Sequence, residues 1–175
     1  MKEREIWDAV DAQGNLLGFD LYRDEAGKIP AGIFHTVAEI YVVTRQKEIL
    51  NTLRDPRKPF GMTWEITGGS VLKGETPLEG AVRELREETG ILKKTEELTI
   101  LAVHAIGNSL YYIYATVVEN AAAPIVLQEG ETIDYRFLPY EEFLEEIRRT
   151  SFAVPLSSRF PLHEMQFKAY LDAMV

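Results

Sequence analysis

The stretch that decides the fold spans residues 69–91 and reads GSVLKGETPLEGAVRELREETGI. Its centre predicts a helix from Pro77 to Thr89. Thr76 is a suitable N-cap, proline is favoured at the first helical position, and Glu79 completes a capping-box pattern with Thr76. Gly90 is a natural stop, because glycine accepts the left-handed conformation that follows a last helical turn. Local chemistry therefore predicts both ends of this helix.

The predicted helix carries two different faces. At about 100° per residue, Glu84, Glu87 and Glu88 fall on one narrow stripe, which is expected to point away from the core. Arg83 lies four residues before Glu87, near enough to steady that carboxylate. Three ionised carboxylates this close repel one another, which raises their pKa values unless a cation lies among them. Oxygen ligands alone favour a hard divalent ion, Mg²⁺ or Mn²⁺. A separate stripe is apolar and is expected to pack on the core: Leu78, Ala81, Val82 and Leu85.

An isolated glutamate stripe is more often a solvated surface, so the surrounding residues decide its interpretation. Gly69 is followed after five residues by Glu75 and after seven more by Arg83, which opens the string RELREETGI. This pattern, at residues 69–91, resembles the Nudix box at every defined position. The resemblance implies an α/β fold of the α+β kind, a Nudix-type α/β/α sandwich with a mixed central β-sheet.

The resemblance also implies a reaction. Members of the Nudix hydrolase family use Mg²⁺ or Mn²⁺ and water to cleave a diphosphate linkage, in a nucleoside diphosphate joined to another group or in a related organic diphosphate. By resemblance, Glu84, Glu87 and Glu88 are metal ligands that Arg83 orients, and any of the three is a candidate general base. The other residues that the resemblance marks are two further metal-ligand candidates, the backbone carbonyl of Gly68 and the carboxylate of Glu131 with Glu129 as its alternative, and three residues that support the box, Gly69, Glu75 and Gly90.

Elements outside the box are predicted from hydrophobic alternation and turn residues. An N-terminal hairpin over 4–23 has strands at 5–11 and 16–23, and a loop follows at 24–32. A terminal helix at 162–174 is expected to dock on the core or on a second subunit. The remaining predicted strands are 36–44, 48–53, 64–67, 98–106, 110–118, 125–127 and 134–138, with a further helix at 139–149.

Length and composition limit the possible classes of protein. With 175 residues and no repeat or linker, the sequence predicts a single domain over 1–175. The net charge of −9 argues against a nucleic-acid polymer as partner, because phosphate backbones bind clustered Lys and Arg. There is no cysteine, which excludes thiolate chemistry. No signal or membrane-spanning stretch is recognisable, so we expect a cytoplasmic protein without a membrane partner. The resemblance makes a homodimer the expected assembly.

Two rival functions differ in kind from a hydrolase. The first residues, with His35 before a strand, resemble the Nudix branch that includes isopentenyl-diphosphate isomerase, but that enzyme needs a cysteine and this chain has none. His35 is therefore expected to be structural or on the surface. A ligand-sensing Nudix module without turnover is the other rival, although such modules usually lose the catalytic glutamates that this chain keeps. The ranking is hydrolase first, sensor second and isomerase third.

The group attached to the diphosphate is not specified by the box. Nucleoside triphosphates, dinucleoside polyphosphates, nucleotide sugars and isoprenoid diphosphates all remain open. Arg54, Arg57 and Lys58 flank a loop near the box and are interpreted as scattered surface charge in preference to phosphate ligands. Aromatic residues near the predicted site are expected mostly to pack in the core, with stacking on a substrate as the alternative: Phe60, Trp64, Tyr111, Tyr112, Tyr114 and Tyr135.

Overall fold

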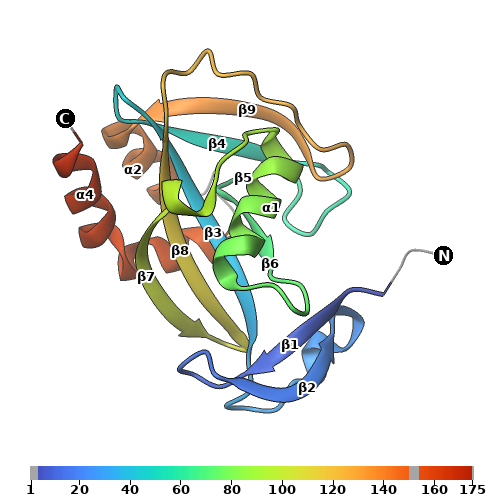
Figure 1. The fold of residues 1–175 in the computed structure, drawn as a ribbon. Helices are drawn as coiled ribbons and strands as arrows, with labels where there is room; N and C mark the ends of the chain where they lie inside the picture. The colour runs from blue at the N-terminus through green and yellow to red at the C-terminus, as the bar shows by residue number, and fades with distance from the viewer. Residues whose placement is uncertain (1–3, 150–153, 175) are drawn as a thin grey trace.

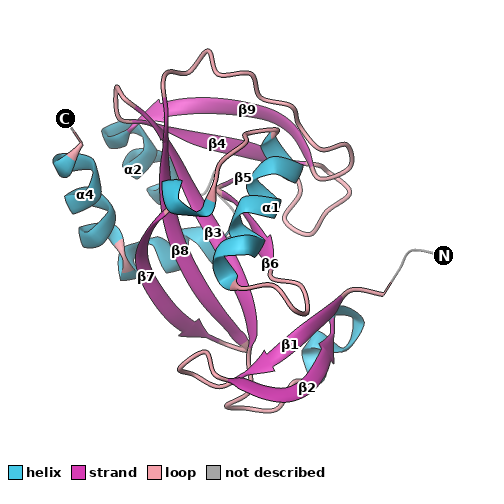
Figure 2. Cartoon of the chain, in the orientation of Figure 1, coloured by secondary structure: helices cyan, strands magenta, loops and turns pink. Residues whose placement is uncertain are grey.

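A computed structural model describes residues 4–149 and 154–174 (Figure 1). The fold is mixed α+β, as predicted, with helices on both sides of a mixed sheet (Figure 2). The strands are β1 Ile6–Val10, β2 Leu16–Tyr22, β3 His35–Thr44, β4 Glu48–Arg54, β5 Trp64–Glu65, β6 Thr67–Ser70, β7 Thr99–Ile106, β8 Ser109–Val118 and β9 Thr132–Pro139. The α-helices are α1 Pro77–Thr89, α2 Tyr140–Arg148, α3 Val154–Arg159 and α4 Glu164–Ala173; short 3₁₀ turns are η1 Arg23–Lys28, η2 Thr95–Glu97 and η3 Phe160–Leu162.

Strand β3 is the axis of the main sheet. It pairs in parallel with β8 along its whole length, from His35 opposite Ser109 to Thr44 opposite Val118. On its other side it pairs antiparallel with β4 at one end and with β6 at the other. Strand β9 extends the sheet beyond β4, and β7 pairs with β8. Because β3 is rich in β-branched and aromatic residues, it suits this central, doubly covered position.

The alternation of side chains along β3 separates two layers. Ala38, Ile40 and Val42 point to one face, where they pack against Ala81 and Leu85 of α1. The predicted apolar stripe of that helix is therefore confirmed. Side chains on the other face of β3 pack against the helices near the C-terminus: Tyr41 and Val43 meet Phe143, Phe160 and Phe167. Figure 1 shows α1 on one side of the sheet and α2 and α4 on the other.

The hairpin of β1 and β2 forms a separate two-stranded sheet at the end of the main sheet (Figure 1). Its register pairs Ile6 with Tyr22 and Trp7 with Leu21. A bridge between Val10 and Phe34 ties it to the segment that enters β3. The predicted hairpin is confirmed.

Three predictions about local structure need correction. The predicted strand at 125–127 has no strand partner; the Val126 amide instead donates to the carbonyl of Thr89 at the end of α1, at 2.8 Å. The predicted single strand at 64–67 is two strands, since the chain leaves β4 after Glu65 and joins β3 from Thr67. The terminal helix begins at Glu164 because Phe160–Leu162 form a 3₁₀ turn, and helix α3 before it was not predicted.

Among the described helices, none combines the length and apolar character that a membrane crossing needs.

Candidate active site

Two glycines of the box lie where a side chain would disturb the local structure. A Cβ built on Gly69 would lie 2.5 Å from the carboxyl carbon of Glu84, so a larger residue at this position would displace that carboxylate. Gly90 ends α1 with φ of 72°, a left-handed conformation that residues with a side chain rarely adopt. At the other end of the helix, Thr76 and Glu79 form the predicted capping box. Both ends of α1 are thus defined by local interactions, as predicted.

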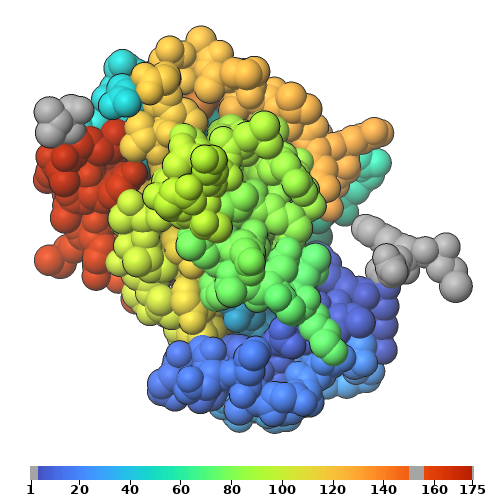
Figure 3. Space-filling model, viewed as in Figure 1, coloured from blue at the N-terminus to red at the C-terminus, as the bar shows by residue number. Residues whose placement is uncertain are grey.

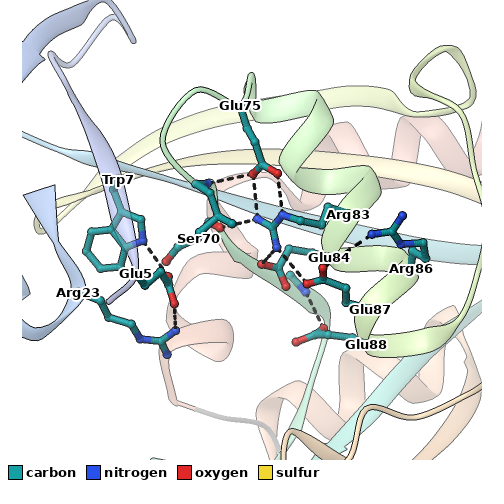
Figure 4. A network of polar contacts seen from close by, with 12 residues as sticks. Glu5, Trp7, Arg23, Ser70, Glu75, Arg83, Glu84, Arg86, Glu87 and Glu88 are labelled. Atoms are coloured by element: carbon teal, nitrogen blue, oxygen red, sulfur yellow. Dashed lines mark hydrogen bonds and ion pairs between the residues drawn. The ribbon is translucent and has the colours of Figure 1, made fainter. Parts of the chain in front are cut away.

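Arg83 is held by more contacts than the sequence indicated. Its guanidinium donates two hydrogen bonds to Glu75, with Nε–Oε1 and Nη2–Oε2 distances of 2.7 and 2.9 Å. It also donates to the Ser70 carbonyl at 3.0 Å, to Glu84 at 2.7 Å and to Glu87 at 3.2 Å (Figure 4). Burial works to raise the pKa of Glu75, but the bonds from Arg83 and the Leu72 amide outweigh it and lower that pKa. Glu75 is therefore an ionised anchor that fixes the orientation of Arg83.

Glu84 and Glu87 share the single guanidinium of Arg83. Burial is the main cause that raises the pKa of Glu84, and the neighbouring charge of Glu87 adds to it, although Arg83 acts in the opposite direction. Glu87 is the more exposed of the two and also lies 3.8 Å from Arg86. The cluster thus contains more negative charge than its arginine compensates.

Glu88 lies in the protein interior, and this corrects an expectation. The glutamate stripe was expected to point away from the core, but the Glu88 side chain is only 8% exposed. One of its oxygens accepts a hydrogen bond from the Gly68 amide at 3.1 Å (Figure 4). Burial raises the pKa of Glu88 well above its usual value, and the carboxylates of Glu65 and Glu84 raise it further. Glu88 is buried because α1 packs against β6, close enough for its carboxylate to reach the Gly68 amide.

The glutamates are gathered on one side of α1 but are not arranged around a common point. In the described part of the chain, no three acidic or histidine side chains converge in a geometry that would hold a metal ion. Glu84 and Glu87 are bonded to Arg83, and Glu88 to the Gly68 amide. Coordination of an ion by all three therefore requires side-chain rotation.

The candidate acidic residue from the later loop lies near this cluster. Glu131 adds to the rise in the pKa of Glu88, and its carboxylate pairs with Lys58. Its alternative, Glu129, is exposed and acts electrostatically on Arg57 instead. Of the two candidates, Glu131 is therefore the one that lies beside the α1 glutamates. Lys58 is not the scattered surface charge that the sequence suggested, because it is mostly buried beside Glu131.

A cavity of about 250 Å³ adjoins the cluster at Gly68. Two ion pairs line it: Arg54 with Glu65 from β4 and β5, and Arg159 with Glu39 from α3 and β3. The sequence did not indicate Glu39, Glu65 or Arg159 as site residues. Arg54 was interpreted as surface charge. The only signal for Glu39 is a charged residue inside an otherwise apolar strand. Exposed Phe60 and the ring of Tyr111, whose centroid lies 4.4 Å from the Arg159 guanidinium carbon, add aromatic surface to the cavity lining.

His35 and most of the aromatic residues considered in the sequence lie outside the glutamate cluster. His35 is structural, as expected: it stacks on Trp7 at 4.0 Å and bonds the Ser109 hydroxyl at 2.8 Å. Burial lowers the pKa of His35 to about 4. Three of the remaining aromatics pack as predicted: Trp64, Tyr112 and Tyr114. Tyr135 does not, because its side chain is exposed.

Comparison with known proteins supports the motif. A model of the NUDIX domain matches residues 34–160. An uncharacterized Nudix hydrolase of Listeria monocytogenes is 27% identical over 153 residues, which cover 86% of this chain and 89% of that protein. A crystal structure of a protein from Deinococcus radiodurans superposes with a TM-score of 0.71 at 21% identity, covering 95% of this chain and 99% of that one. The NUDIX domain of Shewanella oneidensis NrtR, solved in complex with ADP ribose, gives a TM-score of 0.54 at 19% identity, covering 68% and 80%. Because the family model spans well over half of the sequence, this chain belongs to the Nudix hydrolase family.

Proposed function

We propose that this Nudix hydrolase uses Mg²⁺ or Mn²⁺ to cleave the diphosphate linkage of a small nucleotide-type molecule, a nucleoside diphosphate joined to another group. The observation that carries the proposal is the surplus of buried carboxylate on α1, directly beside a cavity lined with charged groups. Without a cation, this excess of negative charge destabilises the folded protein. Binding of a cation would remove the repulsion, which makes the cluster a candidate metal site.

The donor set suits a hard divalent ion. Glu84, Glu87 and Glu88 offer only oxygen, and Glu131 adds a further carboxylate from the facing loop. A bound ion would neutralise phosphate charge and lower the pKa of an attacking water. Arg83 orients Glu84 and Glu87, and a carboxylate oxygen of one of the three α1 glutamates accepts the proton of that water.

A ligand with both polar and apolar surface suits the cavity better than an isoprenoid chain. The lining combines two ion pairs with apolar side chains such as Val37, Ile66 and Leu156. The Nε atom of Arg159 is buried and, among the described residues, has no hydrogen-bond partner. A base or ribose offers matching donors and acceptors. The ADP ribose bound to the NrtR domain has this chemistry.

A substrate panel with and without chelator tests the proposal. Purified protein is incubated with nucleoside triphosphates, dinucleoside polyphosphates, nucleotide sugars, ADP ribose and isoprenoid diphosphates, and released phosphate or nucleoside monophosphate is measured. We expect turnover of at least one nucleotide in Mg²⁺ or Mn²⁺ and none in excess EDTA. Glu87→Gln should lower turnover by about 10²–10⁴-fold, because it removes a metal ligand or base from the exposed edge of the cluster.

The matched control is Glu142→Gln, the same chemical change at an exposed position of α2. It should leave turnover unchanged. Equal turnover in the Glu87→Gln and Glu142→Gln variants would remove the cluster from the reaction. Tight nucleotide binding by the wild type without any turnover would favour the sensor function.

A further inference from the structure

The N-terminal hairpin is docked on the loop that connects β6 to α1. Trp7 and Leu21 are buried against Leu72 of that loop. The Lys73 amide donates to the Ile6 carbonyl at 2.9 Å. The Gly74 amide donates to Asp8 at 2.7 Å, and Lys73 pairs with Asp20 at the same distance. Figure 3 shows the hairpin in direct contact with this loop. The hairpin therefore has a defined position relative to the α1 glutamates.

One end of the hairpin carries an ion pair that is itself anchored. Arg23 Nη1 donates to Glu5 Oε2 at 2.6 Å, and the Arg23 amide donates to the Glu5 carbonyl at 3.2 Å. The other oxygen of Glu5 accepts from the indole of Trp7 at 2.8 Å. Because Trp7 is buried and stacked on His35, the Glu5 carboxylate is held in place and fixes the direction of Arg23.

Arg23 faces the carboxylate cluster from the side opposite α1. In Figure 4 its guanidinium lies across from Glu84 and Glu88, with no labelled side chain between them. The bond from Glu5 is the main cause that raises the pKa of Arg23, and the charges of Glu131 and Glu84 add to it. In return, Glu5 adds to the rise in the pKa of Glu84. The hairpin pair is thus within electrostatic reach of both walls of the candidate active site.

Arg23 is more exposed than three other cations near the site. Arg83, Arg54 and Lys58 are mostly buried and bonded to carboxylates. The Arg23 side chain is 60% exposed, and among the described residues only its Nη1 has a partner, Glu5. Nε and Nη2 therefore remain available to a ligand, and a guanidinium presents such donors in the geometry that phosphate oxygens accept.

We propose that Arg23, positioned by Glu5 on the docked hairpin, binds a phosphate oxygen of the diphosphate substrate. This rests on the proposed function, since it assigns a phosphate ligand to the same site. It gives the hairpin, which lies outside the Nudix box, a direct part in substrate binding. A dianionic bridge that approaches a cluster of glutamates gains from a positive group on the opposite wall.

Calorimetric binding of methylenediphosphonate in Mg²⁺ tests the proposal without knowledge of the organic group. This probe contains only a nonhydrolysable diphosphate bridge. Arg23→Gln should raise its Kd about tenfold, the effect of losing a charge-assisted hydrogen bond. Arg23→Lys should restore part of the affinity. Glu5→Gln should weaken binding in the wild-type background and have no further effect in the Arg23→Gln background, because Glu5 acts through Arg23.

Arg4→Gln is the matched control, since Arg4 lies at the same end of the hairpin but pairs with Asp24 and stacks on Tyr22. It should bind the probe as the wild type does. Equal Kd values for wild type and Arg23→Gln would overturn the proposal, and so would failure of the wild type to bind the probe. Turnover is measured separately on the substrate panel: an active wild type with an unaffected Arg23→Gln variant refutes this inference alone, whereas binding that depends on Arg23 without any turnover refutes only the proposed function.

Discussion

Two buried charged regions lie on either side of Gly68 and differ in their balance. In the cavity, Glu39 is paired with Arg159 and Glu65 with Arg54, so every carboxylate has its own cation. On α1, Glu84 and Glu87 share the guanidinium of Arg83, which Glu75 also occupies. Glu88 is bonded to the Gly68 amide and, among the described residues, pairs with no cation. The first region is complete within the chain. The second needs positive charge from outside, which is the property expected of a metal and phosphate site.

The difference predicts opposite responses to mutation. Loss of one partner from a balanced buried pair leaves an uncompensated charge and destabilises the fold. Loss of one carboxylate from a crowded cluster relieves repulsion and stabilises the fold while function is lost. At α1, loss of a carboxylate should therefore raise stability and lower activity. At the cavity, loss of a charged partner should lower both.

The largest effect on stability is expected at the balanced pair. Arg159→Gln should lower the free energy of unfolding by about 3–5 kcal/mol, because Glu39 is buried beside it. Urea denaturation followed by circular dichroism measures this. Arg149→Gln, which breaks an exposed pair with Glu145, is the control and should change stability by less than about 1 kcal/mol. Equal effects would mean that the pair does not stabilise the fold.

Acidification should also destabilise the region around the Glu39–Arg159 pair, through the neighbouring His163. His163 is buried against the hydroxyl of Tyr41, which itself donates to Glu39. Burial lowers the pKa of His163 to about 4, and the charges of His104 and Arg159 add to this effect. The unfolded chain therefore binds more protons than the native state between pH 6.5 and 4, so the free energy of unfolding decreases as pH falls through that window.

The expected loss from this histidine is about 3 kcal/mol between pH 7 and pH 4. Unfolding free energies of wild type and His163→Gln at both pH values measure it. The variant should be less stable at pH 7 but should lose less on acidification. The same pH dependence in both proteins would show that His163 does not titrate as stated.

The smallest effect is expected at α1 and has the opposite sign. In EDTA, Glu88→Gln should raise the free energy of unfolding by about 1 kcal/mol, because it removes a buried charge whose pKa burial raises. The glutamine oxygen still accepts from the Gly68 amide. Thermal unfolding in EDTA and in excess Mg²⁺ is the measurement. The ranking should reverse in Mg²⁺, when only the wild type gains from metal binding. A destabilised variant in EDTA would mean that the cluster carries no excess charge.

Local chemistry explains how much the sequence predicted. The ends of α1, its apolar stripe and the proximity of Arg83 to Glu87 follow from capping residues and helical spacing, so they were predicted correctly. Glu88 was placed wrongly because its burial depends on how α1 packs against β6, and helical periodicity carries no information about that contact.

The cavity was beyond prediction for a different reason. Glu39 and Arg159 are 120 residues apart, and α3, which carries Arg159, was not predicted at all. Likewise, residues 125–127 have the apolar character of a strand, but the end of α1 takes up the Val126 amide. Tertiary contacts decide such cases, whatever the local propensity.

Calorimetric titration with Mn²⁺ tests the central claim, that the α1 glutamates bind a divalent cation. Wild type is compared with the triple variant Glu84→Gln, Glu87→Gln, Glu88→Gln, both shown to be folded by circular dichroism. The account predicts saturable binding to the wild type and none to the triple variant. Equal binding to both proteins, or no binding to either, would contradict it.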